Sequence, residues 1–190
     1  MNTTFKTILR KHHYQLMAKL GTQEREKMDL QICDHFKRHI SLPNHAVIAG
    51  YSPIKNECSP LPILEDLVRY QHVLALPAIL GKGKPLVFRA WCPGDAMDVG
   101  EYGILEPRND APLVNPSVLV VPMVGFDVNG YRLGHGGGFY DRTIEMIRKH
   151  QSLLCIGIAY HFQQIERLPA EAHDCRMDYI VTDKEVLAFS

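Results

Sequence analysis

From residue 46 onward, the sequence alternates between short, continuously apolar runs and segments with helical periodicity. Six apolar runs are expected to be strands: 46–51, 72–79, 86–91, 117–122, 153–160 and a short final one at 179–182. Helices are predicted for 61–70 and 139–150. Strands without a polar side are typical of a mostly parallel sheet that helices cover on both faces. The chain is therefore predicted to be an α/β protein whose ligands bind beyond the carboxyl ends of the strands.

Two helices are predicted to precede this alternating region. The first, which Thr3 or Thr4 can cap, carries apolar residues at helical spacing: Phe5, Ile8, Leu9, Leu16 and Leu20. The second begins after Gly21-Thr22, covers about 23–39, and has the apolar stripe Met28, Ile32, Phe36 and Ile40. Farther along, the segment 92–116 is polar and rich in glycine and proline, so little regular structure is expected there.

Composition limits the class of protein. The 190 residues correspond to about one domain, so residues 1–190 are predicted to form a single one. Basic and acidic residues both number 21, and this net charge of zero does not favour non-specific nucleic-acid binding. The apolar runs are too short to span a membrane, and the N-terminus lacks the apolar stretch of a signal peptide. Five cysteines without a C-x-x-C pair fit reduced thiols in a cytoplasmic protein.

Two histidines raise the question of a metal site. His35 and His39 lie one helical turn apart and could share a zinc ion. The sequence places no third ligand beside them, so a solvated helix face is the preferred interpretation.

A glycine cluster lies between the apolar run at 117–122 and the helix predicted at 139–150. Four glycines fall within five positions: Gly134, Gly136, Gly137 and Gly138. Glycine permits positive φ, so consecutive N–H groups can turn toward an anion, and a following helix adds its unpaired N–H groups. Arg132 and Arg142 supply cations, and Asp141 supplies a carboxylate that can hold a metal. The pattern predicts a polyphosphate site.

The known phosphate-loop patterns do not describe this cluster. No Lys-Ser/Thr follows the glycines, so the segment is not a Walker loop. Phe139 stands where the dinucleotide-binding pattern starting at Gly134 requires a glycine. A tight surface turn is the simpler interpretation, but it leaves the paired arginines, the aromatic residues and Asp141 unexplained.

Residues 130–142, preceded by 121–127, closely resemble the signature of the 5-formyltetrahydrofolate cyclo-ligase family, also called methenyltetrahydrofolate synthetases. Four other segments resemble family motifs in the same order: 6–10, 51–57, 102–107 and 173–174 with Asp178. The resemblance implies a three-layer α/β sandwich with a mostly parallel central sheet and an N-terminal helical pair. It also implies an ATP- and magnesium-dependent ligase of one-carbon metabolism, expected to be a cytoplasmic monomer. The implied reaction closes 5-formyltetrahydrofolate to 5,10-methenyltetrahydrofolate through phosphorylation of the formyl oxygen, and it releases ADP and phosphate.

The resemblance also assigns the ATP-binding residues. Lys6 and Arg10 are expected to contact the phosphates from one face of the first helix, although a solvated helix side is the simpler interpretation. The loop expected to wrap the phosphates comprises Arg132, Leu133, Gly134, His135, Gly136, Gly137, Gly138, Phe139 and Tyr140. Arg132 and Asp141 are the expected catalytic residues, and Asp141 and Asp174 the expected magnesium ligands. Arg132 could instead brace the loop by pairing with a carboxylate, and Gly137 stands where some relatives carry lysine.

For folate, the resemblance implies that Ser52, Glu57 and the loop residues His135, Gly136, Gly137, Gly138 and Phe139 bind the substrate. Glu57 is expected to accept the amino and ring N–H groups of the pterin. His135 is expected to be a backbone-compatible filler rather than a proton-transfer group. Five aromatic residues could line a pterin pocket, of which only the last two are favoured: Tyr51, Trp91, Phe126, Phe139 and Tyr140.

Two other functions remain open from the sequence. A sugar-phosphate isomerase or an acyl-CoA-transferase-like protein would use the loop for phosphate without hydrolysing ATP. A non-catalytic folate- or nucleotide-binding protein would bind the same ligands and release no product.

Overall fold

An eight-stranded sheet runs through the centre of the computed structural model, which describes residues 2–189. Its strand order is β13-β12-β10-β7-β1-β2-β3-β6. In chain order these strands are β1 Val47–Ala49, β2 Val73–Ala78, β3 Val87–Ala90, β6 Leu113–Val114, β7 Val118–Pro122, β10 Leu154–Ile158, β12 Tyr179–Val181 and β13 Val186–Ala188. Strands β12, β10, β7, β1 and β2 pair in parallel, whereas β13, β3 and β6 add antiparallel edges. The predicted mostly parallel central sheet is confirmed.

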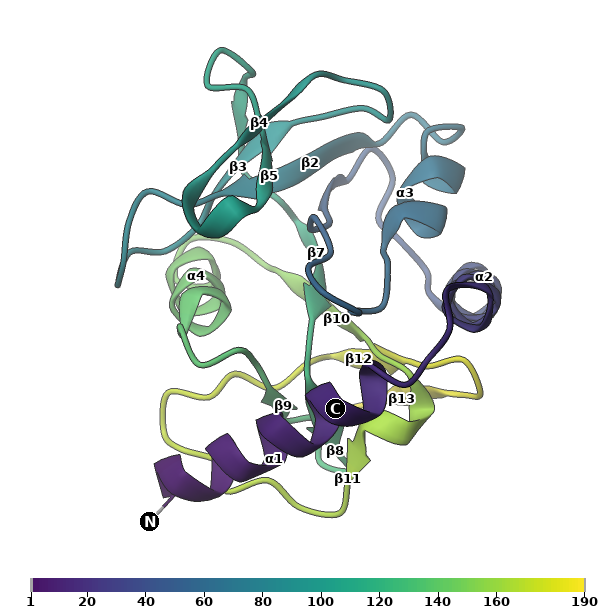
Figure 1. Cartoon of the computed structure of the whole chain (residues 1–190). Helices are drawn as coiled ribbons and strands as arrows, with labels where there is room; N and C mark the ends of the chain where they lie inside the picture. The colour runs from purple at the N-terminus through teal and green to yellow at the C-terminus, as the bar shows by residue number, and fades with distance from the viewer. Residues whose placement is uncertain (1, 190) are drawn as a thin grey trace.

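Helices cover both faces of this sheet, so that the fold has three layers (Figure 1). On one face lie α2 (Thr22–His39) and α3 (Leu61–Leu67), whose apolar residues share a buried cluster with Ile48 and Val120. On the other face lies α4 (Phe139–Arg148), which shares a second cluster with Leu119. Successive strand residues point to opposite faces, so a strand between two helical layers needs apolar residues at every position. This requirement explains the continuous apolar runs.

Helix α1 (Asn2–Met17) lies beside a second, three-stranded sheet rather than on the central one (Figure 1). The strand order of this small sheet is β11-β8-β9, with bounds β8 Gly125–Asp127, β9 Arg132–Leu133 and β11 Gln164–Ile165. Met17 packs there with Val124 and Leu133. The N-terminal helical pair is therefore split: α2 covers the central sheet, and α1 covers the segment that leads into the glycine loop.

Two predictions for the helices are corrected. Helix α1 already includes Thr3 and Thr4, so neither residue is its N-cap. Phe5 and Ile8 are 47% and 60% exposed, because α1 contacts the protein through its second half and its polar face. For α2 the expected stripe is confirmed, since Ile32, Phe36 and Ile40 are buried.

The segment 92–116 contains more structure than the sequence predicts. It forms a hairpin of β4 (Met97–Val99) and β5 (Leu105–Pro107), joined by a 3-10 turn at Glu101–Gly103, and then β6. The strands β8, β9 and β11, the 3-10 turn His161–Gln163 and β13 were not predicted either. These elements are two to three residues long, and several are exposed, so they lack an apolar pattern. In the described part of the chain, no helix has both the length and the apolar character needed to cross a membrane.

A buried carboxylate holds the turn between β8 and β9. Asp127 is fully buried, and its Oδ1 accepts the N–H groups of Asn129 (2.9 Å) and Tyr131 (3.0 Å). Its Oδ2 accepts the N–H of Leu168 (3.0 Å). The carboxylate therefore connects the β8–β9 turn, which precedes the glycine loop, to the backbone at Leu168.

Replacement of Asp127 by asparagine is expected to lower the free energy of unfolding by roughly 2 kcal/mol, because the amide would turn a donor toward a buried N–H. Urea unfolding measures the effect. The matched control is Asp110→Asn at an exposed carboxylate, for which a change within about 0.5 kcal/mol is expected. Equal unfolding midpoints for the two variants would contradict the assigned role of Asp127.

Candidate active site

A cavity of about 590 Å³ opens where the parallel strands end. Tyr51 and Ser52, which follow β1, and Pro122, the last residue of β7, line it. Its other walls are α1, the β4–β5 hairpin, the glycine loop and the segment 171–174. The cavity therefore lies beyond the carboxyl ends of β1 and β7, as predicted for this sheet type.

The glycine loop forms one wall and leads into α4. Gly136 and Gly138 have φ values of 100° and 65°, a region that other residues rarely adopt. Gly138 is the N-cap of α4, so the free N–H groups of the first helical turn face the loop. The Arg142 guanidinium donates a hydrogen bond to the Gly137 carbonyl (2.7 Å). The loop is therefore held in place at the N-terminus of α4, a position that favours the binding of an anion.

The cations predicted on the first helix do reach this cavity. The Lys6 Nζ donates to Asp174 Oδ2 (2.7 Å) and lies 3.6 Å from a Glu171 oxygen. The Arg10 Nε donates to the Gly134 carbonyl, 2.8 Å away and 124 positions along the chain. A solvated helix side is therefore excluded for both residues.

Arg132 and Asp141 form an ion pair in the wall of the cavity. The Arg132 Nη2 lies 2.8 Å from Asp141 Oδ1, and the two side chains are 4% and 15% exposed. The Cys175 N–H also donates to Asp141 Oδ1 (3.2 Å). This arrangement is the bracing role that the sequence left open for Arg132. Within residues 2–189 the Arg132 Nε has no hydrogen-bond partner, so the guanidinium retains donor capacity.

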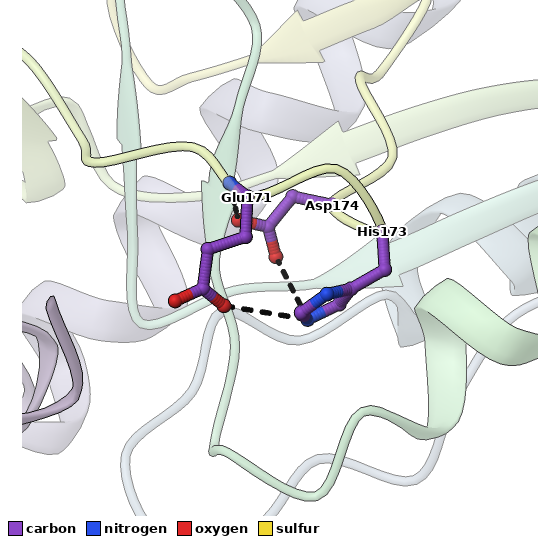
Figure 2. Close-up of side chains that lie close together, drawn as sticks. All are labelled: Glu171, His173 and Asp174. Atoms are coloured by element: carbon purple, nitrogen blue, oxygen red, sulfur yellow. Dashed lines mark hydrogen bonds and ion pairs between the residues drawn. The ribbon is translucent and has the colours of Figure 1, made fainter.

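Two acids and a histidine lie close together in the segment 171–174, which lines the cavity (Figure 2). Ligand atoms of Glu171, His173 and Asp174 lie within 4.8 Å of one another, and this is the one group of metal-ligand type among the described residues. The His173 Nε2 is 3.4 Å from Glu171 and 3.8 Å from Asp174. Burial acts to raise the pKa of the Asp174 carboxyl, but hydrogen bonds from Lys6 and the Glu171 N–H outweigh it and lower the pKa. Asp174 is thus a carboxylate at neutral pH.

Glu57 lies deep in the cavity, with its side chain 4% exposed. Its Oε2 accepts the Ile54 N–H (2.8 Å), and its Oε1 contacts the Nε2 of His135. The Tyr14 hydroxyl lies 2.6 Å from the other ring nitrogen of His135. The expectation that His135 is only a filler is therefore wrong, because its ring links two distant segments.

Several other predictions for the site can be placed. Phe139, Tyr140 and Tyr51 line the cavity, whereas Trp91 and Phe126 belong to the buried core. Ser52 is at the rim and donates to the Leu105 carbonyl (2.6 Å). The pair His35 and His39 lies elsewhere on α2, where the His35 ring contacts the Thr182 carbonyl (2.8 Å).

Some residues that line the cavity or contact its lining were not predicted from the sequence as site residues. Tyr14 follows Arg10 by four positions, so helical spacing was a signal for it. Tyr102 lies in the β4–β5 turn with φ of 63°, and its ring centroid is 6.5 Å from that of Phe139. Glu106 accepts the Ile79 N–H (3.2 Å), and burial raises the pKa of its carboxyl. Glu171 and His173 complete the set: His173 is part of the segment 173–174 that resembles a family motif, and Glu171 lies three positions before Asp174.

Comparison with known families gives a single result. The family model described as 5-formyltetrahydrofolate cyclo-ligase matches residues 2–183. The chain belongs to this family. The family resemblance of the sequence motifs is therefore confirmed. The prediction that the chain belongs to a family of ligases is confirmed with it.

Several relatives match over almost their whole length. A 5-formyltetrahydrofolate cyclo-ligase from Haemophilus influenzae is 31% identical over 92% of this chain and 95% of its own. The enzyme of that name from Escherichia coli is 30% identical over 88% of this chain and 94% of its own. The NMR structure of a 5,10-methenyltetrahydrofolate synthetase from Aquifex aeolicus superposes with a TM-score of 0.78 at 34% identity, covering 96% of this chain and 92% of the other. The structure of a 5,10-methenyltetrahydrofolate synthetase from Mycoplasma pneumoniae superposes with a TM-score of 0.75 at 27% identity, covering 94% of this chain and 98% of the other.

The pair of Arg132 and Asp141 is expected to be strongly coupled. Removing either charge leaves the other buried without its partner, so Arg132→Met and Asp141→Asn should each cost about 3 kcal/mol of unfolding free energy. The double variant should cost about 2 kcal/mol less than the sum of the single variants. Urea unfolding of the four proteins measures this coupling.

The exposed pair of Lys149 and Glu145, 2.9 Å apart, provides the control cycle. Its coupling should stay below about 0.5 kcal/mol, as is usual for surface pairs on a helix. Additive effects of the Arg132 and Asp141 variants would contradict the bracing role.

Proposed function

We propose that this protein closes 5-formyltetrahydrofolate to 5,10-methenyltetrahydrofolate in an ATP- and magnesium-dependent reaction that releases ADP and phosphate. One observation carries the proposal: an anion-binding end and a buried acid lie in the same cavity. Lys6, Arg10 and the glycine loop form the first end, and Glu57 forms the second. We also propose that the protein acts on these small molecules as a cytoplasmic monomer.

The anion-binding end suits the phosphates of ATP. The glycine loop at the N-terminus of α4 offers backbone N–H groups, and two side chains of α1 add positive charge. Arg132 is at the base of the loop, where a guanidinium can stabilise the charge of a phosphoryl group in transfer. No lysine is present at Gly137, so Lys6 and the arginines supply the cationic groups here.

The other end suits the pterin. A carboxylate with two oxygens matches an amino group and a neighbouring ring N–H, and the buried position of Glu57 strengthens such bonds. Phe139 and Tyr140 provide flat apolar surface in the same cavity, and Tyr140 is uncharged because burial raises its pKa far above the usual range. Ser52 lies at the rim.

The chemistry needs little beyond positioning. The formyl oxygen attacks the γ-phosphorus of ATP, and the bond from that phosphorus to ADP breaks. The second folate nitrogen then attacks the activated formyl carbon and loses its proton, and the carbon–oxygen bond breaks to release phosphate as the ring closes. The protein must align these atoms and neutralise the phosphoryl charge, so it needs no nucleophile of its own.

Asp141 and Asp174 are the residues proposed to hold magnesium. Both line the cavity and offer carboxylate oxygens, the ligand type that magnesium prefers, and it commonly takes one or two of them. In this structure each pairs with a cation, Asp141 with Arg132 and Asp174 with Lys6. When bound, the metal would neutralise negative charge on the phosphates. The exchange of ion-pair partners would free Lys6 and Arg132 for the same phosphates.

The direct test is the near-ultraviolet absorbance of methenyltetrahydrofolate when the purified protein is mixed with 5-formyltetrahydrofolate, ATP and magnesium. Product is expected only when all three are present, and none with a non-hydrolysable ATP analogue. Absence of product from folded protein and intact folate would contradict the proposal. Product without ATP would contradict the phosphorylation step.

Lys6→Met is expected to raise the KM for ATP about tenfold and leave the KM for folate within about twofold, because Lys6 is at the phosphate end. Tenfold corresponds to about 1.4 kcal/mol, close to the lower limit of about 1.5 kcal/mol for a hydrogen bond to a charged group. The matched control is Lys11→Met, an exposed lysine on the same helix. Equal kinetics of the two variants would remove Lys6 from the ATP site.

A further inference from the structure

Three residues from distant parts of the chain form a continuous set of contacts at the cavity, and two of them, Glu57 and His135, line it. Tyr14 comes from α1, His135 from the glycine loop and Glu57 from the segment after β1. The Tyr14 hydroxyl is 2.6 Å from His135 Nδ1, and the two rings are 19° from parallel with centroids 5.9 Å apart. The His135 Nε2 contacts Glu57 Oε1. This set links the first helix to the buried acid through the loop.

The direction of these hydrogen bonds follows from the groups involved. Burial, and after it the charge of Glu57, raise the pKa of Tyr14, so its hydroxyl keeps its proton and can donate. A carboxylate can only accept, so the Nε2–H of the ring donates to Glu57, and in that tautomer Nδ1 accepts from the Tyr14 hydroxyl. Lys55 Nζ lies 4.5 Å from the centroid of the Tyr14 ring and adds a cation–π contact that stabilises the ring's position.

The carboxylate of Glu57 is thereby fixed on both oxygens. Oε2 accepts the Ile54 N–H (2.8 Å), and Oε1 accepts from His135. A carboxylate offers about four lone-pair sites, so each oxygen retains one for a donor that enters the cavity. Two anchored oxygens with one free site each match a ligand with two adjacent N–H groups.

We propose that His135, oriented by Tyr14, is a positioning residue that holds the Glu57 carboxylate in the orientation in which it receives the N–H pair of the folate. The proposal rests on the proposed function, in which Glu57 binds the pterin. It gives α1 a second role, since Lys6 and Arg10 serve the phosphate end while Tyr14 serves the folate end. It also makes residue 135 a determinant of folate affinity rather than of ATP affinity.

The test compares three variants: His135→Leu, His135→Gln and Tyr14→Phe. Leucine removes the donor to Glu57, glutamine retains an N–H donor near the position of Nε2, and phenylalanine removes only the hydroxyl. Calorimetry gives the Kd for 5-formyltetrahydrofolate and for a non-hydrolysable ATP analogue, and steady-state kinetics give kcat and both KM values. The control is Tyr70→Phe, which removes an exposed hydroxyl away from the cavity.

His135→Leu is expected to raise the Kd and KM for folate about tenfold, with the ATP constants within about twofold of the unmodified protein. His135→Gln should restore most of the folate affinity. Tyr14→Phe should weaken folate binding about threefold, yet have no further effect in the His135→Gln protein, because glutamine has no counterpart of Nδ1. Equal losses for both ligands, or no rescue by glutamine, would overturn the proposal, since a merely structural role predicts that result.

Glu57→Gln separates this proposal from the one on which it rests. If Glu57→Gln leaves the folate Kd unchanged, the assignment of Glu57 to the pterin is wrong. If Glu57→Gln weakens folate binding while the His135 and Tyr14 variants do not, the assignment stands and only the positioning role is overturned.

Discussion

The site depends on how helix α1 is held across the ends of the sheet. Residues 6, 10 and 14 lie one turn apart on one face of the helix, and each makes a polar contact with the site. Lys6 contacts Asp174, Arg10 contacts the Gly134 carbonyl, and Tyr14 contacts His135. On the same helix, Met17 packs in an apolar cluster with Leu133. One regular helix thus aligns the C-terminal acidic segment and the glycine loop.

A second feature of the site is that three of its acids each contact a basic side chain. Asp141 pairs with Arg132, Asp174 with Lys6, and Glu57 with His135. Buried or half-buried charges are costly when unpaired, so the pairs with Arg132 and Lys6 let Asp141 and Asp174 stay charged beside the cavity. Under the proposed function, the phosphates would pair with Lys6 and Arg132, and the divalent cation with Asp141 and Asp174. Such an arrangement is compatible with a chain whose net charge is zero.

Much of the fold followed from the sequence, because the central strands are covered on both faces. Five central strands are continuous apolar runs: β1, β2, β7, β10 and β12. Such a run predicts a buried strand without knowledge of the strands that pair with it. The hairpin of β4 and β5 was missed because it is largely exposed and carries no alternating pattern. The strands β8 and β9 are three and two residues long, too short to show a strand pattern in the sequence. For Phe5 and Ile8, helical spacing was present, but α1 buries other residues.

By itself the sequence determined which chemical groups this protein has and in which order: a glycine loop at a helix start, cations on the first helix, and acids at 57, 141 and 174. These are local properties, since φ preferences, helix ends and helical spacing act within a few residues. Only the tertiary structure decided which groups meet. Tyr14 and His135 are 121 positions apart, and His135 and Glu57 are 78 apart. Their contact depends on how α1 docks and how the loop turns, and both are set by packing between segments that share no local pattern.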